Sequence, residues 1–120
     1  MEKQVLVVDD QIGIRLLLEE VISQEGYKVE QAVNGKEALD SVKEQQPDLL
    51  VLDYKLPIIN GYEVLKQLEE EGINVPTIVM SGLPDRAKED MKEFQNVKAY
   101  SSKPFQLNDM RELVNSILAE

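Results

Sequence analysis

Two adjacent aspartates, Asp9 and Asp10, directly follow an apolar run near the start of the chain. Two like charges side by side repel each other, so a pair held at the end of a core strand needs a positive partner. Carboxylate oxygens are ligands that Mg²⁺ prefers, which makes a divalent cation the first candidate. Taken alone, the pair has a simpler explanation, in which Asp10 caps the following helix and Asp9 faces solvent.

Three further polar side chains lie at or just after the ends of other apolar runs: Asp53, Ser81 and Lys103. Asp53, which we expect nearest the middle of the site, can act as a nucleophile toward a phosphoryl group. Lys103 and a divalent cation together balance the charge of three carboxylates, and phosphoryl transfer needs mainly positioning and charge neutralisation. Ser81 can donate a hydrogen bond to a phosphoryl oxygen, with Gly82 beside it leaving room for that group.

Ser81 and Lys103 also have ordinary explanations, as a turn serine and a surface lysine. Pro104 bears on the second of these, because an X-Pro bond restricts the residue before it. Such a bond can also be cis, which would aim the ammonium group of Lys103 back into the site.

The segment after Asp53 has the pattern D-x-x-x-P-x-x-x-G over residues 53–61. Pro57 ends the strand, and Gly61 permits a close or left-handed backbone just before the next helix. We expect this loop to present a backbone carbonyl, that of Lys55, to the cation. Asn60-Gly61 by itself is equally typical of an ordinary turn.

The composition limits the classes of function. The chain has 120 residues and a formal net charge of −10, with its lysines and arginines scattered singly. Nucleic acid and anionic membranes would repel such a chain, so we expect neither as a partner. Cysteine and histidine are both absent, which excludes disulfides, histidine-based catalysis and the usual zinc sites.

Short apolar runs alternate with amphipathic stretches, which predicts an α/β protein with a parallel sheet and helices on both faces. The expected strands are 5–9, 28–32, 48–53, 76–82 and 97–102, and the expected helices are 12–26, 34–46, 61–72, 84–95 and 107–120. Right-handed crossovers favour the doubly wound order 2-1-3-4-5, with the second strand near an edge and the third at the centre. In such a sheet ligands bind at the carboxyl ends of the strands, where the polar residues above would meet. The length suits a single domain over residues 1–120.

These motifs together resemble the receiver domain of two-component response regulators. The resemblance rests on Asp9-Asp10, on the 53–61 pattern, on Ser81-Gly82 and on the segment Tyr100-x-x-Lys103-Pro104-Phe105. It implies a flavodoxin-like receiver fold and a phosphoprotein with Asp53 as the phosphoacceptor.

The resemblance also implies a role for each site residue. It implies Mg²⁺, for which Mn²⁺ or Ca²⁺ can substitute, held by Asp10, Asp53 and the Lys55 carbonyl, with Asp9 assisting. Lys103 and Ser81 would contact the phosphoryl group, and Tyr100 would be the aromatic residue that reorients together with Ser81.

The segment 8–21 is similar to that of the stand-alone phosphorelay regulators that start sporulation in endospore-forming bacteria. This similarity implies a cytoplasmic, monomeric phosphotransferase that takes a phosphoryl group from a sensor histidine kinase. It would pass the group to a histidine phosphotransferase built on a four-helix bundle, and a phosphatase is a further candidate partner. The docking surface would lie around the first helix and the segment after Lys103, and would comprise Gln11, Ile12, Ile14, Leu17, Pro104 and Phe105.

Helix periodicity supports a docking surface, because the first helix has more apolar residues than one core stripe needs. Leu17, Leu18, Val21 and Ile22 form the expected core face, whereas Ile12 and Leu16 project away from it and Ile14 lies at its border. These residues could also be scattered surface apolar residues.

Two other functions stay open. A receiver can signal by shape, with phosphorylation shifting the face formed by 84–95, 97–102 and 107–120, and the thin apolar stripe of 84–95 favours such movement. A metal-dependent phosphohydrolase would need acids two residues apart on the first strand and a cap domain, so adjacent acids and a short chain argue against it.

Overall fold

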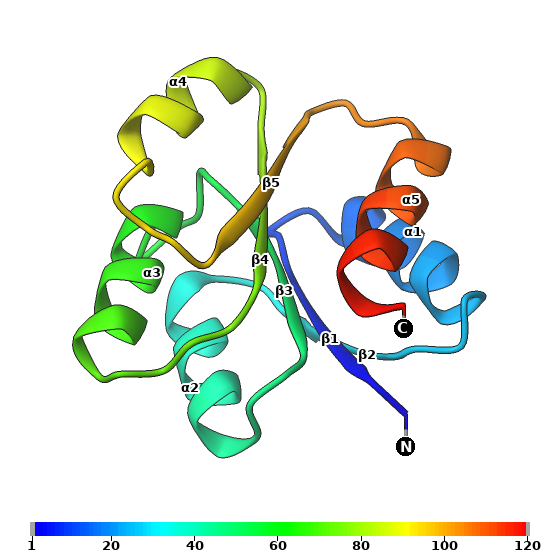
Figure 1. Cartoon of the computed structure of the whole chain (residues 1–120), viewed down its shortest axis with the longest axis horizontal. Helices are drawn as coiled ribbons and strands as arrows, with labels where there is room; N and C mark the ends of the chain where they lie inside the picture. The colour runs from blue at the N-terminus through cyan, green and yellow to red at the C-terminus, as the bar shows by residue number, and fades with distance from the viewer. Residues whose placement is uncertain (1, 120) are drawn as a thin grey trace.

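The computed structural model describes residues 2–119 of the chain, and these form a five-stranded parallel sheet between two layers of helices (Figure 1). Strands and helices alternate along the chain. They are β1 (Gln4–Val8), α1 (Ile12–Ser23), β2 (Lys28–Ala32), α2 (Gly35–Glu44), β3 (Leu49–Asp53), α3 (Gly61–Glu70), β4 (Thr77–Ser81), α4 (Pro84–Asp90), β5 (Val97–Ser102) and α5 (Leu107–Leu118). The sheet order is β2-β1-β3-β4-β5, which confirms the predicted topology, the central position of β3 and the edge position of β2.

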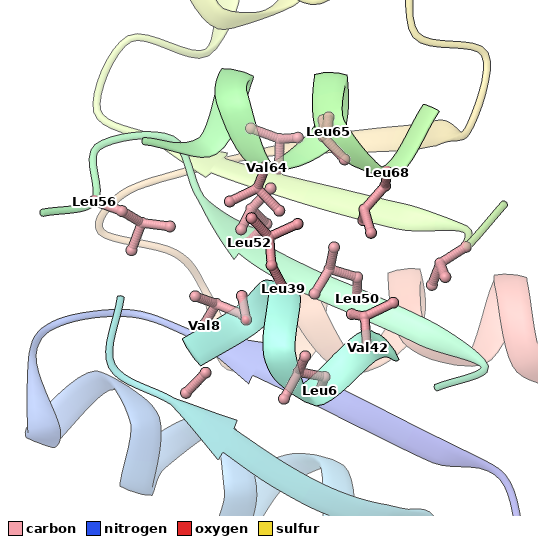
Figure 2. Packing of buried hydrophobic residues seen from close by; sticks show 14 of the residues in the cluster. Leu6, Val8, Leu39, Val42, Leu50, Leu52, Leu56, Val64, Leu65 and Leu68 are labelled. Carbon is pink, nitrogen blue, oxygen red and sulfur yellow. The ribbon is translucent and has the colours of Figure 1, made fainter. Parts of the chain in front are cut away.

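The sheet is apolar on both faces because each face is covered by helices. Helices α1 and α5 cover one face, and α2, α3 and α4 cover the other (Figure 1). Side chains of β1 alternate accordingly, since Leu6 and Val8 face the α2 and α3 side whereas Val5 and Val7 face α1 and α5. Figure 2 shows the first of these cores, in which Leu50 and Leu52 of β3 pack between the helices.

The register of the central strands places the acidic residues level with one another. Val8 of β1 pairs with Leu52 of β3, so the next residue of each strand, Asp9 and Asp53, reaches the same edge of the sheet. In turn, Asp53 pairs with Met80, which brings Ser81 to that edge as well. The buried apolar runs therefore fix how far each polar residue extends beyond the core.

Two helices end earlier than their sequence patterns predict. Helix α1 ends at Ser23 rather than near Gly26, whose φ of +93° is one that glycine adopts without strain. Helix α4 ends at Asp90, whereas its pattern predicts helix to residue 95. Met91 and Phe94 are buried, but they lie in the irregular segment between α4 and β5, where the Phe94 ring packs on Tyr62 with centroids 5.1 Å apart. The predicted end of the last helix at Glu120 lies outside the described residues.

The inner face of α1 also differs from the prediction. Leu17, expected in the core, leaves 37% of its surface exposed, and the buried residues of this helix are Arg15, Leu18, Val21 and Ile22. Leu18, Val21 and Ile22 thus form the core face as expected, but Arg15, three residues before Leu18, joins it in place of Leu17. Leu107, the first residue of α5, is likewise 38% exposed.

Candidate phosphoryl-acceptor site

The carboxyl ends of β1, β3, β4 and β5 surround one cleft of about 780 Å³. It is lined by Asp10, Gln11, Ile14, Asp53, Tyr54, Lys55, Ser81, Gly82, Leu83, Arg86, Lys103 and Pro104. The polar residues that the sequence places after separate strands thus come together, at the switch point where β1 and β3 are neighbours.

The three carboxylates form one cluster. Asp9, Asp10 and Asp53 each offer an oxygen atom, and these atoms all lie within 4.8 Å of one another. Asp9 is fully buried and Asp53 is 5% exposed, whereas Asp10 faces the cleft opening. The capping explanation for the aspartate pair is wrong, because the N-cap of α1 is Gln11 and Asp9 does not face solvent.

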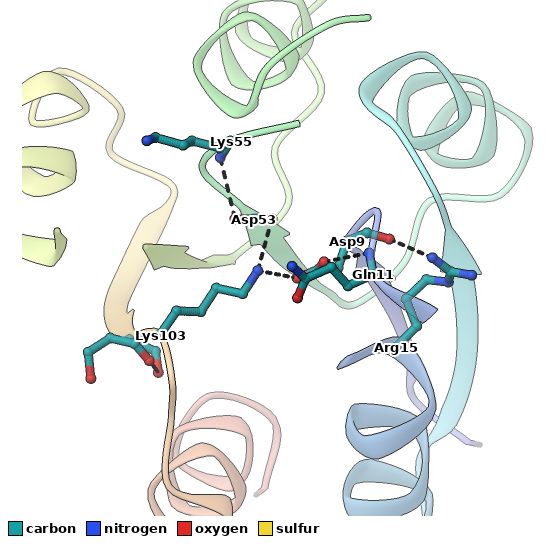
Figure 3. A network of polar contacts seen from close by, with 8 residues as sticks. Asp9, Gln11, Arg15, Asp53, Lys55 and Lys103 are labelled. Carbon is teal, nitrogen blue, oxygen red and sulfur yellow. Dashed lines mark hydrogen bonds and ion pairs between the residues drawn. The ribbon is translucent and has the colours of Figure 1, made fainter. Parts of the chain in front are cut away.

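Lys103 is the cation that the two buried carboxylates share. Its Nζ lies 2.8 Å from Oδ2 of Asp9 and 3.1 Å from Oδ2 of Asp53 (Figure 3). The other oxygen of each carboxylate accepts a backbone N–H, from Gln11 at 2.9 Å and from Lys55 at 3.3 Å. Lys103 is therefore no simple surface lysine. The peptide bond that joins it to Pro104 is cis.

Burial and charge oppose each other at the two ionised groups. Burial raises the pKa of Asp53 above its ordinary value, the hydrogen bond from Lys103 lowers it, the charge of Asp9 raises it, and the net shift is upward. For Lys103, burial lowers the pKa, but hydrogen bonds to Asp9 and Asp53 outweigh this effect and the net pKa is raised. An ionised Asp53 is thus held in an environment that partly opposes its charge.

Ser81 is 6% exposed at the end of β4, and its Oγ accepts the N–H of Leu83 at 3.0 Å. This is the turn contact that the alternative explanation expected. A hydroxyl that accepts one hydrogen bond can still donate another, so the turn orients Ser81 without using up its proton. The carbonyl of Ser81 also accepts the N–H of Lys103 at 2.8 Å, which ties β4 to the lysine segment.

The loop after Asp53 is held tightly against the strand. A Cβ atom at Gly61 would lie 2.9 Å from the carbonyl oxygen of Asp53, so the close approach requires glycine. Asn60 caps α3 by accepting the N–H of Glu63 at 3.0 Å. Ile58 has a φ of +71° and is 76% exposed, an unfavourable backbone for a β-branched residue. Lys55 lines the cleft, and the role of its carbonyl as a ligand stays a prediction.

The proposed docking residues are partly exposed beside the cleft. Ile12 is 64% and Leu17 37% exposed, while Ile14 and Pro104 line the cleft itself. Phe105 is partly buried and packs against the core beneath α5. Tyr100 is partly buried, and burial raises its pKa.

The structure adds residues that the sequence analysis missed. Arg86 and Tyr54 line the cleft, and the Tyr54 hydroxyl donates a hydrogen bond to Asp90, which raises the pKa of Tyr54. Arg15 is buried and donates to the carbonyl oxygen of Asp9. The position of Arg15, three residues before Leu18, could have indicated that it lies on the inner face of α1. No pattern in the sequence indicates that Arg86 lines the cleft.

The donor set fits a hard divalent cation. Clustered carboxylate oxygens on an open cleft are the ligands that Mg²⁺ takes together with water and phosphate oxygens. The absence of histidine and cysteine leaves oxygen as the ligand atom.

Comparison with known proteins agrees with this geometry. The family model for the response regulator receiver domain matches residues 5–115. This chain belongs to the response regulator receiver family. Receiver domains accept and transfer phosphoryl groups on aspartate, which is compatible with the site described above.

Single-domain relatives match the receiver over nearly its full length. The chain is 37% identical over 118 residues to sporulation initiation phosphotransferase F of Bacillus subtilis, covering 98% of this chain and 95% of that protein. It is 33% identical to the chemotaxis protein CheY of Thermotoga maritima, covering 98% of each. The receiver domain of the Francisella response regulator 1452 superposes with a TM-score of 0.88 at 30% identity, covering 97% of this chain and 96% of that one.

Among residues 2–119, none of the receiver's helices combines the length and apolar character that a membrane crossing requires.

Proposed function

We propose that this receiver is a phosphorelay intermediate that takes a phosphoryl group from a histidine kinase onto Asp53 and passes it to a histidine phosphotransferase. The observation that carries the proposal is the Asp53 carboxylate, which lies in the cleft with Lys103 Nζ 3.1 Å from one oxygen. Similarity to sporulation initiation phosphotransferase F supports a relay that controls sporulation. The proposal places the regulator in the cytoplasm as a monomer.

The transfer is balanced and needs no further reactant. An Asp53 oxygen attacks the phosphorus of a phosphohistidine, the P–N bond breaks, and the imidazole nitrogen leaves with the electron pair. The new O–P bond makes an acyl phosphate, and a second histidine reverses the step. Lys103 then faces a phosphoryl oxygen, and Ser81 donates its hydroxyl proton to another.

A divalent cation completes the site in this proposal. Asp10, Asp53 and the Lys55 carbonyl would hold Mg²⁺, with Asp9 assisting, and Mn²⁺ or Ca²⁺ can take its place. When bound, the cation supplies positive charge to the phosphoryl oxygens. The remaining work belongs to the chain, which fixes the acceptor, excludes water from Asp9 and holds Lys103 between the two buried acids.

The partner surface in this proposal surrounds the cleft opening. Exposed apolar side chains lie on α1, in Ile12 and Leu17, and on the cleft rim, in Pro104, and the partly buried Ile14 also lines the cleft. An apolar rim around a charged cleft suits a helical bundle that presents a phosphohistidine side chain, and a phosphatase could use the same surface. Gln11, which lines the cleft beside them, and the partly buried Phe105 complete the surface.

Radiolabel transfer tests the proposal directly. We expect the wild type to be labelled by a phosphorylated histidine kinase in the presence of Mg²⁺, and to return the label to a histidine phosphotransferase. Asp53→Asn should remove labelling while the protein stays folded. If label reaches Asp53 but never returns to histidine, the relay assignment is wrong and only the acceptor role survives.

A second variant separates docking from chemistry. Ile14→Ala should slow transfer with the protein partner and leave labelling by acetyl phosphate unchanged, because a small donor needs no docking surface. Ala119→Gly, at the far end of α5, is a control that should affect neither reaction. Equal rates for Ile14→Ala and the control with the protein donor would contradict the docking surface.

Signalling by shape is a second candidate, favoured by two observations. A second cleft of about 470 Å³ lies along β5 and α5 and is lined by Tyr100, Phe105 and Asp109 among others. The neighbouring α4 is only seven residues long. If phosphorylation changes amide exchange in α4 and β5 and creates a binding surface for a target, without onward transfer, this function replaces the relay.

A further inference from the structure

Arg15 is a charged residue on the buried face of α1. It is 9% exposed and lies three residues before the fully buried Leu18. Its NH1 group donates to the carbonyl oxygen of Asp9 at 2.9 Å, and its Nε donates to Oε1 of Gln31 at 3.1 Å. Both acceptors are uncharged oxygens, so these bonds do not neutralise the guanidinium.

A buried cation bound only to neutral acceptors is expensive to keep. An apolar side chain would fit the helical stripe that continues into Leu18 and Ile22 and would avoid that cost. The arginine therefore does something that an apolar residue could not do, which is to donate hydrogen bonds. Its two bonds hold the residue after β1, Asp9, and a residue of β2, Gln31.

The bond to Asp9 acts on the backbone that carries the acidic pair. Figure 3 shows the guanidinium on the side of Asp9 away from Lys103, so the residue is held from both directions. The Asp9 side chain in turn accepts the N–H of Gln11 at 2.9 Å, which closes the turn containing Asp10. On the other side, Gln31 donates to Glu19 of α1 at 3.1 Å, so its amide is fixed as well.

We propose that Arg15 is a positioning residue for the cation site, which clamps the Asp9 carbonyl and thereby fixes the Asp9-Asp10 turn in its metal-binding form. The inference rests on the proposed function, because it assumes that this acidic cluster binds a divalent cation. Arg15 contacts none of the carboxylate oxygens, so it acts through the backbone.

Two effects of Arg15 on cation affinity have opposite signs, which makes the proposal testable. Its positive charge repels a nearby cation, so removing that charge alone would tighten binding. Its hydrogen bonds preorganise the turn, so removing them would weaken binding, and supporting residues around metal sites typically change affinity by about 10- to 100-fold. The proposal requires the second effect to win.

The experiment measures Mn²⁺ affinity from the free-ion signal in electron paramagnetic resonance, using unphosphorylated protein. Arg15→Met should raise the dissociation constant by about 10-fold. Arg15→Lys keeps the charge and a single donor nitrogen in place of the two that bond Asp9 and Gln31, and should recover part of the loss. Arg111→Met on α5, whose arginine pairs with Glu25 at 3.4 Å, is the matched control and should leave affinity unchanged.

A metal-free readout accompanies the titration. The Gln11 amide, bonded to Asp9, should exchange with solvent faster in Arg15→Met than in the wild type, whereas a purely electrostatic role would leave its exchange unchanged. Circular dichroism tests whether each variant is folded. If Arg15→Met is unfolded, Gln31→Met takes its place, because it removes only one of the two hydrogen-bond acceptors of Arg15. We then expect a smaller loss of Mn²⁺ affinity, about 3-fold, which lies below the range for supporting residues around metal sites.

The outcomes separate this inference from the proposed function. A wild type that binds no Mn²⁺ overturns the cation site and the inference together. A wild type that binds, with Arg15→Met equal or tighter, overturns only the positioning role. Weakening in Arg15→Met together with faster Gln11 exchange supports it.

Discussion

Replacing Lys103 by methionine removes the one ammonium group that contacts both buried carboxylates. The methionine keeps most of the aliphatic length, so the main change is the lost charge. Asp9 and Asp53, with side chains 0% and 7% exposed, then face each other without that cation. We expect a large fall in the free energy of unfolding at neutral pH. Its cause would be the unpaired buried charges, and not a cavity left in the core.

The magnitude follows from the geometry. Unit charges about 3 Å apart attract by about 5–6 kcal/mol at an effective dielectric constant of about 20, and Lys103 makes two such contacts. Desolvation of the three groups offsets much of this attraction, and removing one partner of a buried ion pair typically costs about 3–5 kcal/mol. Because the Lys103 side chain keeps 18% exposure, we take the lower end, about 3 kcal/mol. For a chain of 120 residues this corresponds to a fall in Tm of about 12 °C.

Urea unfolding followed by circular dichroism measures the loss. Lys36→Met is the matched control, because Lys36 pairs with Asp40 at 3.3 Å but both side chains are about two-thirds exposed, 67% and 66%. Such a pair contributes less than about 0.5 kcal/mol. Lowering the pH should reduce the difference in unfolding free energy between Lys103→Met and the wild type. Protonation of one buried carboxylate removes the repulsion between Asp9 and Asp53.

Two results would refute this reasoning. One is a Lys103→Met variant with the same urea midpoint as Lys36→Met at neutral pH. The other is a deficit that stays constant as the pH falls through the carboxylate range, which would mean that the loss comes from packing. Added Mg²⁺ should restore part of the stability if the cation site is as proposed, through binding to the folded state alone.

Three further predictions follow from single positions. The pKa of Asp53 is higher in the folded protein than in the unfolded chain. Asp53 therefore adds fully to the free energy of unfolding below the ordinary pKa of aspartate, and this contribution is lost as the pH rises through the folded pKa. Asp53→Asn should therefore be more stable than the wild type at neutral pH and lose that advantage in acid, as measured by urea midpoints; a constant difference would contradict the linkage. Gly61→Ala should slow labelling by acetyl phosphate, because its Cβ would lie 2.9 Å from the Asp53 carbonyl, whereas Gly13→Ala, with no atom within 4 Å of the added Cβ, should stabilise α1 by about 1 kcal/mol without slowing it. Ile58→Asn should raise the unfolding free energy by about 1 kcal/mol, since asparagine tolerates the φ of +71°, and an unchanged Tm would show that the loop carries no strain.

The strands and helices could be predicted because they depend on local signals, and the strand order followed from the right-handed crossovers of a parallel sheet. The alternation of apolar runs with helical stripes identified all ten elements, and the run expected at 48–53 became the central strand, β3. Element ends were less predictable. Helix α4 stops at Asp90, and two apolar residues that the pattern placed on it, Met91 and Phe94, are buried in the segment that follows.

The candidate site was predictable in membership but not in detail. Asp53, Ser81 and Lys103 could be assigned because parallel strands place their carboxyl ends at one edge, so position along the chain translated into position in space. The inner face of α1 could not be assigned in the same way. This helix is rich in leucine, so its periodicity alone does not show that Arg15 is buried and Leu17 partly exposed. Burial there depends on what packs opposite, and only the Asp9 carbonyl and the Gln31 amide make that place suitable for a guanidinium.

By itself, then, the order of residues determined that three acids and a lysine would meet at the end of a parallel sheet, since hydrophobic periodicity fixes strands and strands fix direction. The tertiary structure alone decided which acid is buried, that Lys103 bridges Asp9 and Asp53, and that Arg15 holds the same turn from behind. Those outcomes depend on distances of about 3 Å between residues up to 94 positions apart in the chain, and no local pattern encodes separations of that kind.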